Sequence, residues 1–508
     1  MLFAAAAQIR ASYSLITTAI AIHIASALGS TVFYRLSPWH SLARFPGPFL
    51  WRISTLRLVV ISLTGKRYIL LDDLHRKYGP FVRIGPSQLS INLHSANSII
   101  YGPGTHMEKG DSYITPGHLG AAALFFKQKT KEIHQERKRI WSPAFTRPSI
   151  MNFIPAVERR TWDLLHCVKR RQSESPVQTL DLSEAFCHWA YDTMCEIVFG
   201  GSNNLELMQN GDPEGLVAGG KFATVILDCI GQSPWLMDLA WHIPLGKSMV
   251  RLRDVAAAMM RNRVKADSDV TMRDLTSYLG QTTSGERIPL TDLELDAVVA
   301  IQGGSDNTST TLSLAFYYML TSPHGYYAKL QQELDETFHD RDGPLDWDIL
   351  AALPYLNAVI NEALRLASPY YLPRVVPAGG VVIDGEFIAQ GTTVALAAYS
   401  QQTSPENFYP DPLDYRVERW LPGGLGPGSK TEKAALYSFS SGPHVCIAKS
   451  FAYQEMRYAL ARLVLAYNFK LAPKFDARKY RDGILNMRTT LLKEPLSVTA
   501  YIRESRKD

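Results

Sequence analysis

A single cysteine near the end of the chain, Cys446, stands in a stretch that favours a reactive thiolate. It lies in FSSGPHVCIA, residues 439–448, where Phe439, Gly442 and Cys446 form the pattern FxxGxxxC. A thiolate persists at neutral pH beside positive charge or peptide dipoles, and a tight Gly/Pro loop before a helix supplies such dipoles. A thiolate of this kind is a strong axial ligand for haem iron. On this stretch alone, a small buried hydrophobic residue is the simpler interpretation.

A second stretch, AIQGGSDNTST at 300–310, places polar side chains inside a long apolar helix. Two adjacent glycines precede Asp306, Asn307 and Thr308, although each glycine inside a helix costs about 1 kcal/mol relative to alanine. The missing side chains would let a flat ligand lie against the helix, with the polar groups handling protons beside it. A local kink in the helix is the alternative interpretation.

Two further stretches carry charges that need partners if they are buried. In NEALR, residues 361–365, Glu362 and Arg365 share one face of a predicted helix. Arg419, in DPLDYRVERW at 411–420, would complete a network with this pair. Burial makes mutual pairing necessary, because desolvation of each ion costs several kcal/mol. A surface pair of little consequence is the alternative.

In order and spacing, these four stretches resemble the motifs of the cytochrome P450 family, and the resemblance spans residues 30–500. FSSGPHVC resembles the haem-binding loop, and NEALR resembles the ExxR motif. DPLDYRVERW resembles the PERW region, with Val417 in place of proline, and GGSDNT resembles the oxygen-activating helix. Each motif alone is weak, but four in the same order are specific. The strand region and the aromatic content are similar to those of fungal members.

The resemblance implies a haem cofactor whose proximal iron ligand is Cys446. Ligation by a thiolate pushes electron density toward the iron and favours O–O bond cleavage. Phe439 would pack beside the haem near the sulfur, and Gly442 would allow a close approach of the backbone. The residues implied to form a structural network, without a catalytic role, are Glu362, Arg365 and Arg419.

Four residues resemble those that meet the haem propionates in this family. HQERKR resembles the helix whose cations face the propionates, and His134 and Lys138 are spaced to share one helix face. Arg374, in YLPRVV, matches the arginine that reaches a propionate from the strand after the ExxR helix. His444 stands where the family usually has an arginine, which would weaken one contact and make it sensitive to pH. A solvated helix face is the alternative for His134 and Lys138.

The oxygen-activating helix departs from the family at Asn307, where most members have a threonine that helps to deliver protons to oxygen. An amide donates a hydrogen bond but cannot ionise. Asp306 is retained, and Thr308 lies one residue further on, about 100° around the helix. We therefore expect Asp306, Asn307 and Thr308 to be the catalytic residues, with water held by Asn307 in the proton path. Ala448 replaces the glycine that is common after the cysteine.

The resemblance implies a monooxygenase that uses O2 to hydroxylate or otherwise oxidise a hydrophobic small molecule. We expect a fungal secondary metabolite such as a terpenoid. By analogy, the loop 104–124 would close the pocket, and the apolar stretch 233–245 would form a membrane-dipping access lid, with core packing as the alternative. The residues expected to contact the substrate are Val299, Gln302, Gly303, Tyr371 and Leu372.

Two other functions stay open at this point. A reductase-independent isomerase or dehydratase is favoured by Asn307, because relatives of that kind lack the threonine. The retained Asp306 and the membrane anchor favour the monooxygenase. A membrane-bound haem protein that binds a ligand without turnover is the second alternative, and the intact acid and glycines argue against it.

Electrons would come from a second protein, because no GxGxxG motif opens a βαβ unit and no flavin domain is apparent. The resemblance implies an NADPH-dependent cytochrome P450 reductase on the same membrane. Basic residues cluster at 127–139 and are expected on its docking face, since charge steers acidic partners. Charge reversal at Arg137 or Lys129 should then slow electron transfer.

An N-terminal segment, residues 11–34, has no formal charge and is long enough as a helix to cross a bilayer. Basic residues are more frequent after this segment than before it, so the positive-inside rule leaves the rest of the chain in the cytoplasm. The anchor and the hinge resemble those of microsomal cytochromes P450, which implies the endoplasmic reticulum membrane. A cleavable signal peptide is the alternative. The expected parts of the chain are a membrane anchor at 1–36, a proline-rich hinge at 37–50 and a haem domain at 51–508.

The remaining composition is that of an ordinary globular protein: of 508 residues, 46% are hydrophobic and 20% are charged. The net charge of +5 and the lack of a Lys/Arg block argue against nucleic-acid binding. Five scattered cysteines without CxxC spacing argue against zinc and disulfides, and so for a reducing compartment. We expect a mainly α fold with a minor β region, the cytochrome P450 fold, behind an N-terminal transmembrane helix. Helical patterns occupy 131–142, 186–199, 293–320, 324–339, 355–367 and 448–468, and strand patterns occupy 81–92, 374–383, 386–398 and 494–502.

Overall fold

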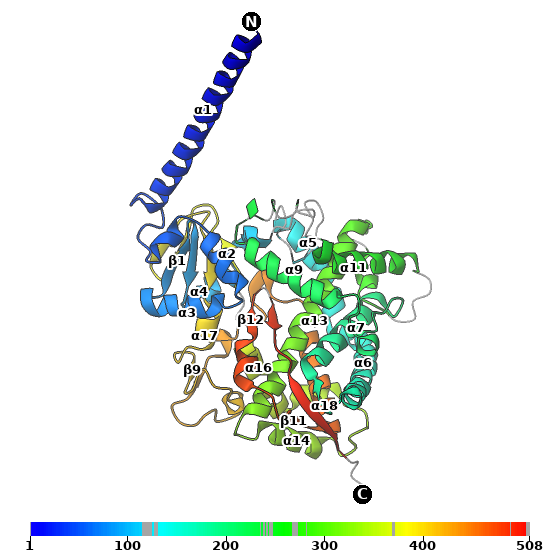
Figure 1. The fold of residues 1–508 in the computed structure, drawn as a ribbon. Helices are drawn as coiled ribbons and strands as arrows, with labels where there is room; N and C mark the ends of the chain where they lie inside the picture. The colour runs from blue at the N-terminus through cyan, green and yellow to red at the C-terminus, as the bar shows by residue number, and fades with distance from the viewer. Residues whose placement is uncertain are drawn as a thin grey trace.

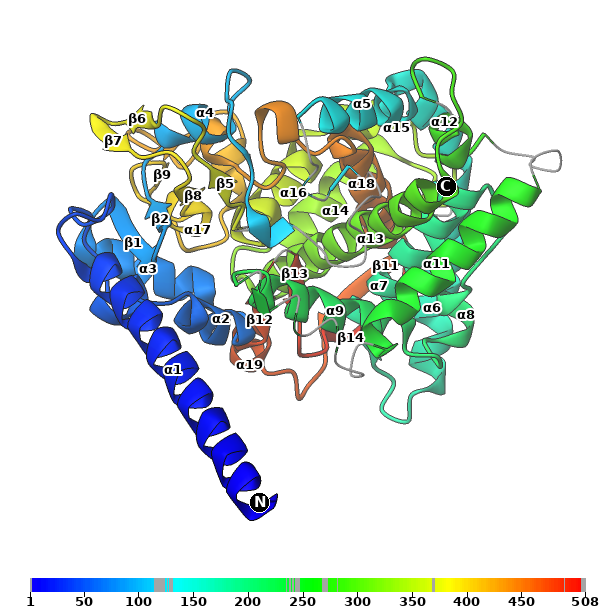
Figure 2. The same cartoon turned by 90° about the horizontal axis from the view of Figure 1, so that it is seen from above.

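The computed structural model describes residues 2–113, 124–125, 127, 131–233, 235–236, 239, 242, 247–266, 273–280, 282–367, 371–487 and 489–503. Most of these residues are helical. The sheet that contains β1 lies to one side of the molecule, and the sheet of β11 and β14 lies among the helices (Figure 1). The expected mainly α fold with a minor β region is therefore confirmed. The long helix α13 (Leu290–Thr321) runs through the middle of the helical part, as Figure 2 shows. It ends as predicted before Pro323, because the residue preceding a proline disfavours helical backbone.

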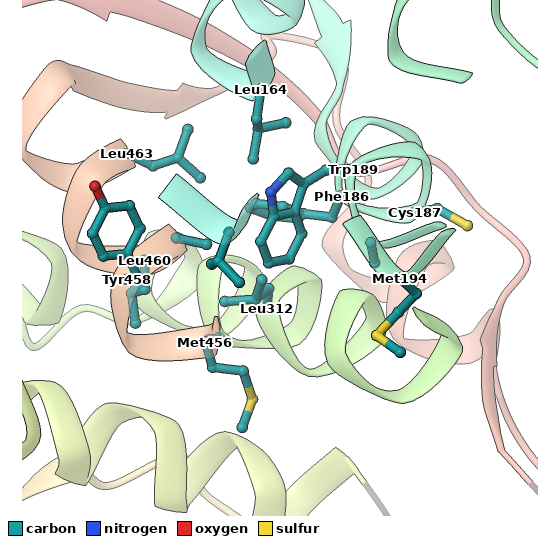
Figure 3. Packing of buried hydrophobic residues seen from close by; sticks show 14 of the residues in the cluster. Leu164, Phe186, Cys187, Trp189, Met194, Leu312, Met456, Tyr458, Leu460 and Leu463 are labelled. Atoms are coloured by element: carbon teal, nitrogen blue, oxygen red, sulfur yellow. The ribbon is translucent and has the colours of Figure 1, made fainter. Parts of the chain in front are cut away.

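The helices around α13 bury their apolar faces against it. Those that pack directly on it include α7 (Leu182–Phe199), α11 (Lys247–Lys265), α16 (Pro354–Ala367) and α18 (Lys449–Ala466). Trp189 of α7 and Leu312 of α13 lie among the side chains that fill the space between these helices (Figure 3). The other helices are α1 (Leu2–Leu36), α2 (Leu56–Leu63), α3 (Arg67–Tyr78), α4 (Ala96–Tyr101), α5 (Lys131–Trp141), α6 (Arg147–Glu174), α8 (Leu207–Asn210), α9 (Leu216–Ile230), α12 (Thr276–Leu279), α14 (Tyr326–Thr337), α15 (Trp347–Ala352), α17 (Ala398–Gln402) and α19 (Ala477–Asp482).

The main sheet joins segments that are far apart in the sequence. Its strands follow the order β1-β2-β8-β5-β3. At one edge of this sheet, β3 pairs antiparallel with β5. Arg374 lies opposite Lys109 in this pair, so two cations are side by side there. The bounds of its strands are β1 (Phe81–Gly85), β2 (Gln88–Ile91), β3 (Glu108–Lys109), β5 (Arg374–Val375) and β8 (Thr393–Leu396).

The smaller sheets include the hairpin predicted from Asp384-Gly385. Both residues have positive φ angles, 50° and 78°, which is the backbone that a tight hairpin turn requires. They join β6 (Val381–Ile383) to β7 (Glu386–Ile388). Two other described sheets have two strands each: β9 (Phe408–Tyr409) with β10 (Lys430–Thr431), and β12 (Ile484–Asn486) with β13 (Thr490–Leu492). In a three-stranded sheet, β14 (Ser497–Ile502) lies between β11 (Tyr467–Leu471) and β4 (Leu180–Asp181).

Short 3₁₀ helices complete the framework and carry several of the predicted site residues. One of them, η7, directly precedes Cys446, and another, η5, contains Arg419. Their bounds are η1 (Phe49–Arg52), η2 (Asp111–Tyr113), η3 (Ser142–Phe145), η5 (Val417–Trp420), η6 (Lys433–Ala435) and η7 (Gly442–His444).

The N-terminal helix α1 extends away from the body of the molecule (Figure 1). Its part Leu15–Leu36 is apolar and long enough to cross a membrane. The chain that follows packs against the body of the molecule, and the hinge role expected for 37–50 stays a prediction. Leu42 is fully buried, and the buried Arg83 of β1 donates to the carbonyl of Arg35 at 3.2 Å. A proline-rich segment is stiff, but here apolar and hydrogen-bonding contacts also fasten it to the main sheet.

Candidate active site

The middle of α13 presents an open face. Val299, Gly303 and Asn307 follow one another at four-residue spacing, and each is half-buried or exposed. A Cβ atom added at Gly303 would meet no atom within 4 Å. Asn307 is fastened to the same face, because its Nδ2 donates to the carbonyl of Gly303 at 3.1 Å. This is the face on which the sequence predicts substrate contacts, and that role stays a prediction.

The neighbouring residues on α13 serve helix packing. A Cβ atom at Gly304 would lie 2.6 Å from the sulfur of Met194 on α7, so the side chain of Met194 fills the space beside this glycine. The expectation that both glycines leave room for a ligand is therefore wrong for Gly304. Gln302, a predicted substrate contact, is tied to α9, since its Nε2 donates to Gly220 O at 3.0 Å and to Thr224 Oγ1 at 2.8 Å.

The predicted acid, Asp306, lies on the buried side of α13. Its Oδ1 accepts a hydrogen bond from the hydroxyl of Tyr191 on α7 at 3.0 Å. Burial raises the pKa of the Asp306 carboxyl, whereas the ammonium of Lys221 and the Tyr191 hydroxyl act in the opposite direction. Thr308 is also buried. The proton-delivery roles of Asp306, Asn307 and Thr308 stay predictions.

Cys446 follows a tight loop whose geometry requires a glycine. The NH of Cys446 donates to the carbonyl of Phe439 at 2.8 Å and closes the loop. Gly442 has a φ of +61°, and a Cβ atom there would collide with the backbone of Tyr101 at the end of α4. The close backbone approach predicted for Gly442 is therefore present, and its partner is α4.

The thiol of Cys446 has an environment unlike that of the other cysteines. Its side chain is exposed, whereas the other cysteines are buried. The surrounding protein still raises the pKa of this thiol by desolvation, and the NH of Ala448 and the ammonium of Lys449 lower it. Lys449 Nζ also lies 5.7 Å from the ring centre of Phe439. Cys446 thus combines access with nearby groups that favour the thiolate.

The predicted propionate residues meet beside the Cys446 loop. Lys138 of α5 donates from Nζ to the carbonyl of Pro443 at 2.8 Å. His134, also on α5, places Nε2 at 3.2 Å from Nδ1 of His444. Arg374 of β5 is buried and lowers the pKa of both histidines. The structure therefore brings together four residues from three separate parts of the sequence.

Lys109 of β3 is a further cation at this place that the sequence did not single out. It is buried, lies opposite Arg374 in the strand register, and donates from Nζ to Leu124 O at 2.8 Å and Phe125 O at 2.7 Å. Its strand is two residues long and carries no periodic pattern. The signal that could have found it is a lysine next to an acid within the predicted loop 104–124, and that signal is weak.

These cations repel one another, and the repulsion is visible in their pKa values. Burial, followed by Lys109, Lys138 and Arg374, lowers the pKa of His134 to about 3. Burial, followed by Arg374 and Lys109, lowers that of His444 to about 2. Burial also holds the pKa of Lys109 well below its ordinary value. This region therefore carries more positive charge than the protein itself balances.

That excess charge fits a ligand with two carboxylates. Glu108 places a carboxylate 3.9 Å from Nε2 of His444, and the cations Lys109, Lys138 and Arg374 outnumber it. Among the described residues, Nε of Arg374 is buried without a hydrogen-bond partner. The two propionates of a haem match this charge, the thiol of Cys446 is a suitable axial ligand, and the residues present therefore fit that group.

The predicted ion network is present and fully buried. Arg365 Nε and Nη2 donate to the two carboxylate oxygens of Glu362 at 2.8 and 2.7 Å. Arg419 Nε lies 3.4 Å from the same carboxylate, and Trp420 Nε1 donates to it at 2.8 Å. Arg365 also donates to carbonyls of the segment that precedes η5, including Pro412 O at 2.6 Å. The network holds α16 against this segment.

Other predicted positions are only partly described. Tyr371 is buried in a separate apolar cluster and does not lie on the open face of α13. The centre of its ring lies 4.7 Å from Cζ of the Arg67 guanidinium. Leu372 is half-buried, and its carbonyl accepts from Tyr101 at 2.8 Å. In the loop 104–124, residues 114–123 lie outside the described residues, as does most of 233–245. Trp235, within 233–245, is exposed.

The expected docking role of Arg137 is wrong. Its side chain is 4% exposed and forms an ion pair with the buried Asp296 of α13, so it cannot reach a partner protein. Lys129 lies outside the described residues. On the solvent side of α5, Arg139 is exposed and lies 3.4 Å from Glu136. The basic cluster at 127–139 therefore divides between buried and solvent-facing charges.

Comparisons with known proteins agree with this site. A family model for cytochrome P450 matches residues 45–492. The chain is 29% identical to cytochrome P450 67 of Uromyces fabae, over 92% of this chain and 87% of that protein. It is 30% identical to cytochrome P450 monooxygenase hepC of Aspergillus oryzae, over 86% and 89%. It is also 30% identical to averantin hydroxylase of Dothistroma septosporum, over 89% and 85%.

Proposed function

Since this chain belongs to the cytochrome P450 family and is a monooxygenase, we propose that Cys446 is the axial ligand of its haem and that a hydrophobic small molecule is oxidised beside α13. The observation that carries the proposal is the meeting of His134, Lys138 and Arg374 with the Cys446 loop. Positive charge that no nearby side chain balances needs a ligand with negative charge.

In this proposal, the chain's residues hold the haem from two sides. Lys109, Lys138 and Arg374 would bind the propionates. One N–H of the neutral His134–His444 pair is used between the two rings, and the other would donate a further hydrogen bond. When bound, the haem supplies oxygen activation, while the protein binds, orients and delivers protons. Cys446 must lose its thiol proton to act as a ligand, and the NH of Ala448 and the charge of Lys449 favour that loss.

The open face of α13 supplies the substrate side of the proposal. Val299 and Gly303 offer an apolar and a side-chain-free surface, against which a hydrophobic molecule can lie. The amide of Asn307, held by Gly303, positions a hydrogen-bonding group on the same face. Asp306 and Thr308 lie behind this face and would supply protons to it.

The substrate class is proposed from the relatives. Two relatives carry names of hydroxylases. They are averantin hydroxylase and the tryprostatin B 6-hydroxylase of Neosartorya fischeri, the latter 29% identical over 89% of this chain and 81% of that protein. These names support a fungal secondary metabolite as the substrate here. A terpenoid is one candidate within that class.

We propose an NADPH-dependent cytochrome P450 reductase as the electron donor. The helix α1 would anchor the chain in the endoplasmic reticulum membrane, because Leu15–Leu36 is apolar enough to span it. Basic residues after α1, such as Arg52 and Arg57, place the body on the cytoplasmic side by the positive-inside rule. The exposed Arg139 on α5 is available to an acidic partner, unlike the buried Arg137.

The first test is the spectrum of the reduced, CO-bound full-length protein in microsomes. Thiolate ligation by Cys446 predicts the strongly red-shifted Soret band of this family. Cys446→Ser should remove that band, while Cys167→Ser, a buried cysteine of α6, should keep it. A red-shifted band that survives in Cys446→Ser would refute the assignment.

The second test separates the monooxygenase from the reductase-independent alternative that Asn307 favours. Candidate fungal metabolites are incubated with the protein, with and without NADPH and reductase. The proposal predicts product only when both are present, together with oxygen uptake. Product formed without them would favour the isomerase or dehydratase.

A further inference from the structure

Three arginines meet where the N-terminal helix α1 joins the body of the molecule. Arg35 is in the last turn of α1, Arg52 ends η1, and Arg83 lies in β1, the strand beside which α1 ends in Figure 1. Arg83 Nη2 donates to the carbonyl of Arg35 at 3.2 Å. Arg35 Nη1 donates to the carbonyl of Ile53, the residue after Arg52, at 2.6 Å. These hydrogen bonds bring the three arginines together at one junction.

This arginine cluster has no carboxylate partner among the described residues. Its hydrogen bonds go to backbone carbonyls and to the ring of His40. Nη1 of Arg83 and Nε of Arg52 are buried and have no hydrogen-bond partner within the described part of the chain. The buried Arg67, by contrast, pairs with Asp228 at 2.9 Å. Because a desolvated cation without a counter-charge is costly, the arginine cluster favours the binding of an anion.

The neighbouring titratable groups show the same excess of positive charge. Burial, followed by Arg52 and Arg35, lowers the pKa of Arg83 to about 10. Burial, followed by Arg83 and Arg35, lowers the pKa of His40 to about 4, so this ring is neutral near pH 7. Among the described groups, no carboxylate acts against either shift. Geometry and charge therefore agree that the junction is positive.

Exposed apolar side chains accompany the arginine cluster. Trp39 is 76% exposed, and Phe33, Phe49 and Leu50 are exposed as well. Phe33 and Trp39 flank Arg35 in the sequence, and their ring centres lie 6.4 Å apart. The other two belong to η1. Exposed aromatic residues at the end of a membrane helix are typical of the interface between lipid and water.

We propose that Arg35 and Arg52 bind the phosphate of one anionic phospholipid, with Arg83 behind them adding its charge. Arg35 and Arg52 are half-buried and can be reached from outside, whereas Arg83 is fully buried. Guanidinium groups bind phosphate oxygens through paired hydrogen bonds. The acyl chains of the lipid would lie on the exposed apolar side chains. This inference rests on the proposed anchoring of the chain in a membrane by α1.

The phosphate group is common to a lipid headgroup and a free phosphate, and two observations favour the lipid. The arginine cluster begins in the last turn of a helix whose part Leu15–Leu36 is long enough to cross a bilayer, so the arginines would lie at the depth of the headgroups. The exposed apolar side chains offer a surface that a free phosphate does not use. A phospholipid matches both parts of the site.

The test is native mass spectrometry of the full-length holoprotein in dodecyl maltoside, titrated with phosphatidylserine or with phosphatidylcholine. We expect one bound phosphatidylserine, held at least about fivefold more tightly than phosphatidylcholine, whose choline adds a positive charge. Arg35→Gln and Arg52→Gln should each weaken its binding about fivefold, and the double variant about 30-fold. Equal affinity of the unaltered protein for the two lipids would overturn the proposal.

The matched control is Arg57→Gln. Arg57 is exposed on α2 and carries the same charge in the same part of the chain, but it is not among the charges that act on Arg83. This variant should keep the affinity for phosphatidylserine. An equal loss in Arg57→Gln and Arg52→Gln would indicate a diffuse attraction between charges and would overturn the assignment of a site.

Each variant must show the CO-bound spectrum of the unaltered protein, so that a failure to fold is recognised separately. Arg52→Gln alone decides if Arg35→Gln does not fold. The one described hydrogen bond of the Arg52 side chain, to Phe45 O, is 3.4 Å long, so its loss should change stability little.

Two competitors separate the sources of phosphate. Inorganic phosphate and glycerophosphoserine, which is the headgroup without acyl chains, are added in large excess over the bound lipid. Neither should displace it, because burial of the acyl chains contributes to its binding. Displacement by either one would assign the site to a free phosphate and overturn the lipid assignment.

The anchor is tested separately, by washing phosphatidylcholine vesicles that carry the full-length protein with alkaline carbonate. Release of the protein would refute the anchoring by α1. The titration in detergent needs no bilayer, so it still reports whether the arginine cluster binds phosphatidylserine.

Discussion

Two buried charged regions of this molecule are built in opposite ways. Around Glu362, one carboxylate accepts from Arg365, Arg419 and Trp420, and backbone carbonyls satisfy more of the guanidinium groups. Around Arg374, several cations share one nearby carboxylate, and burial together with these charges lowers the pKa values of Lys109, His134 and His444. Both regions are buried, so exposure does not distinguish them.

This difference separates buried charges that stabilise the fold from buried charges that bind a ligand. In the first region, one carboxylate and several backbone carbonyls accept hydrogen bonds from both guanidinium groups, and the network holds α16 and the segment before η5 together. A cluster with excess charge is costly on its own, because each desolvated ion lacks a full partner. We infer that the first region serves the fold and that the second is completed by the haem propionates. Four predictions test this contrast.

The largest effect is expected from Glu362→Gln. It leaves Arg365 and Arg419 buried without their counter-charge, which costs about 3–5 kcal/mol of folding free energy. Denaturant unfolding of the purified holoprotein measures the loss. The control is Asp348→Asn, which removes the partner of the exposed Arg147 and should change little. Equal stability of the two variants would contradict the structural role of the network.

A smaller effect is expected from Arg374→Met, and on haem retention more than on folding. Loss of a charged hydrogen bond to a propionate should speed haem release by about 10- to 100-fold. Transfer of haem to a haem-free globin, followed by absorbance, measures this rate. The haem-free chain should be no less stable than the unaltered one, because the substitution removes uncompensated charge. A large drop in its stability would place Arg374 with the structural network.

Haem removal should separate the two regions without any substitution. Amide exchange should become at least about tenfold faster in 439–446 and 108–113, where the cations lose their counter-charge. Residues 361–365 and 411–420 should keep their protection, because protein groups accept the hydrogen bonds of Arg365 there. Hydrogen exchange of the haem-bound and the haem-free protein, measured by mass spectrometry, tests this prediction. Similar loss in both regions would indicate global unfolding instead of a local response.

The smallest effect concerns pH. The pKa of Lys109 is lowered on folding, so the unfolded chain binds more protons between neutral pH and about pH 10. The haem-free chain should therefore gain up to about 1 kcal/mol of stability per pH unit as pH rises through this range. Lys109→Met should flatten that rise, and so should bound haem. A rise that persists in Lys109→Met would assign it to another group.

The network has the opposite dependence on pH. The pKa of Glu362 lies below its ordinary value because Arg365 and Arg419 favour the carboxylate against the effect of burial. Its stabilising contribution is present above the unfolded pKa of about 4.3 and is lost as pH falls below it. Acid should therefore weaken the network, whereas alkali should relieve the cation cluster.

Local chemistry allowed much of the fold to be predicted from the sequence. The end of α13 before Pro323 and the hairpin at Asp384-Gly385 follow from backbone preferences of single residues, and both are confirmed. The pairing of Glu362 with Arg365 follows from helical spacing and is present. These features depend on neighbours in the sequence, which is why they were accessible.

Features that depend on distant contacts were missed. Lys109 joins the cation cluster because β3 pairs with β5, and a two-residue strand leaves no pattern. Arg137 was misplaced because its partner, Asp296, lies on another helix. Gly303 and Gly304 look alike in the sequence, and only the approach of α7 separates their roles. The predicted haem ligand and catalytic residues still require the experiments above.

The fastening of residues 37–50 to the main sheet has a mechanical consequence. A flexible tether would let the body tumble in every direction above a bilayer. Here α1 leads into buried residues such as Leu42, and Arg35 donates to the carbonyl of Ile53 at 2.6 Å. With α1 in a membrane, as proposed above, a twist or tilt of this helix would be transmitted to the body as torque. The search for a partner on that membrane would then reduce mainly to rotation about the bilayer normal.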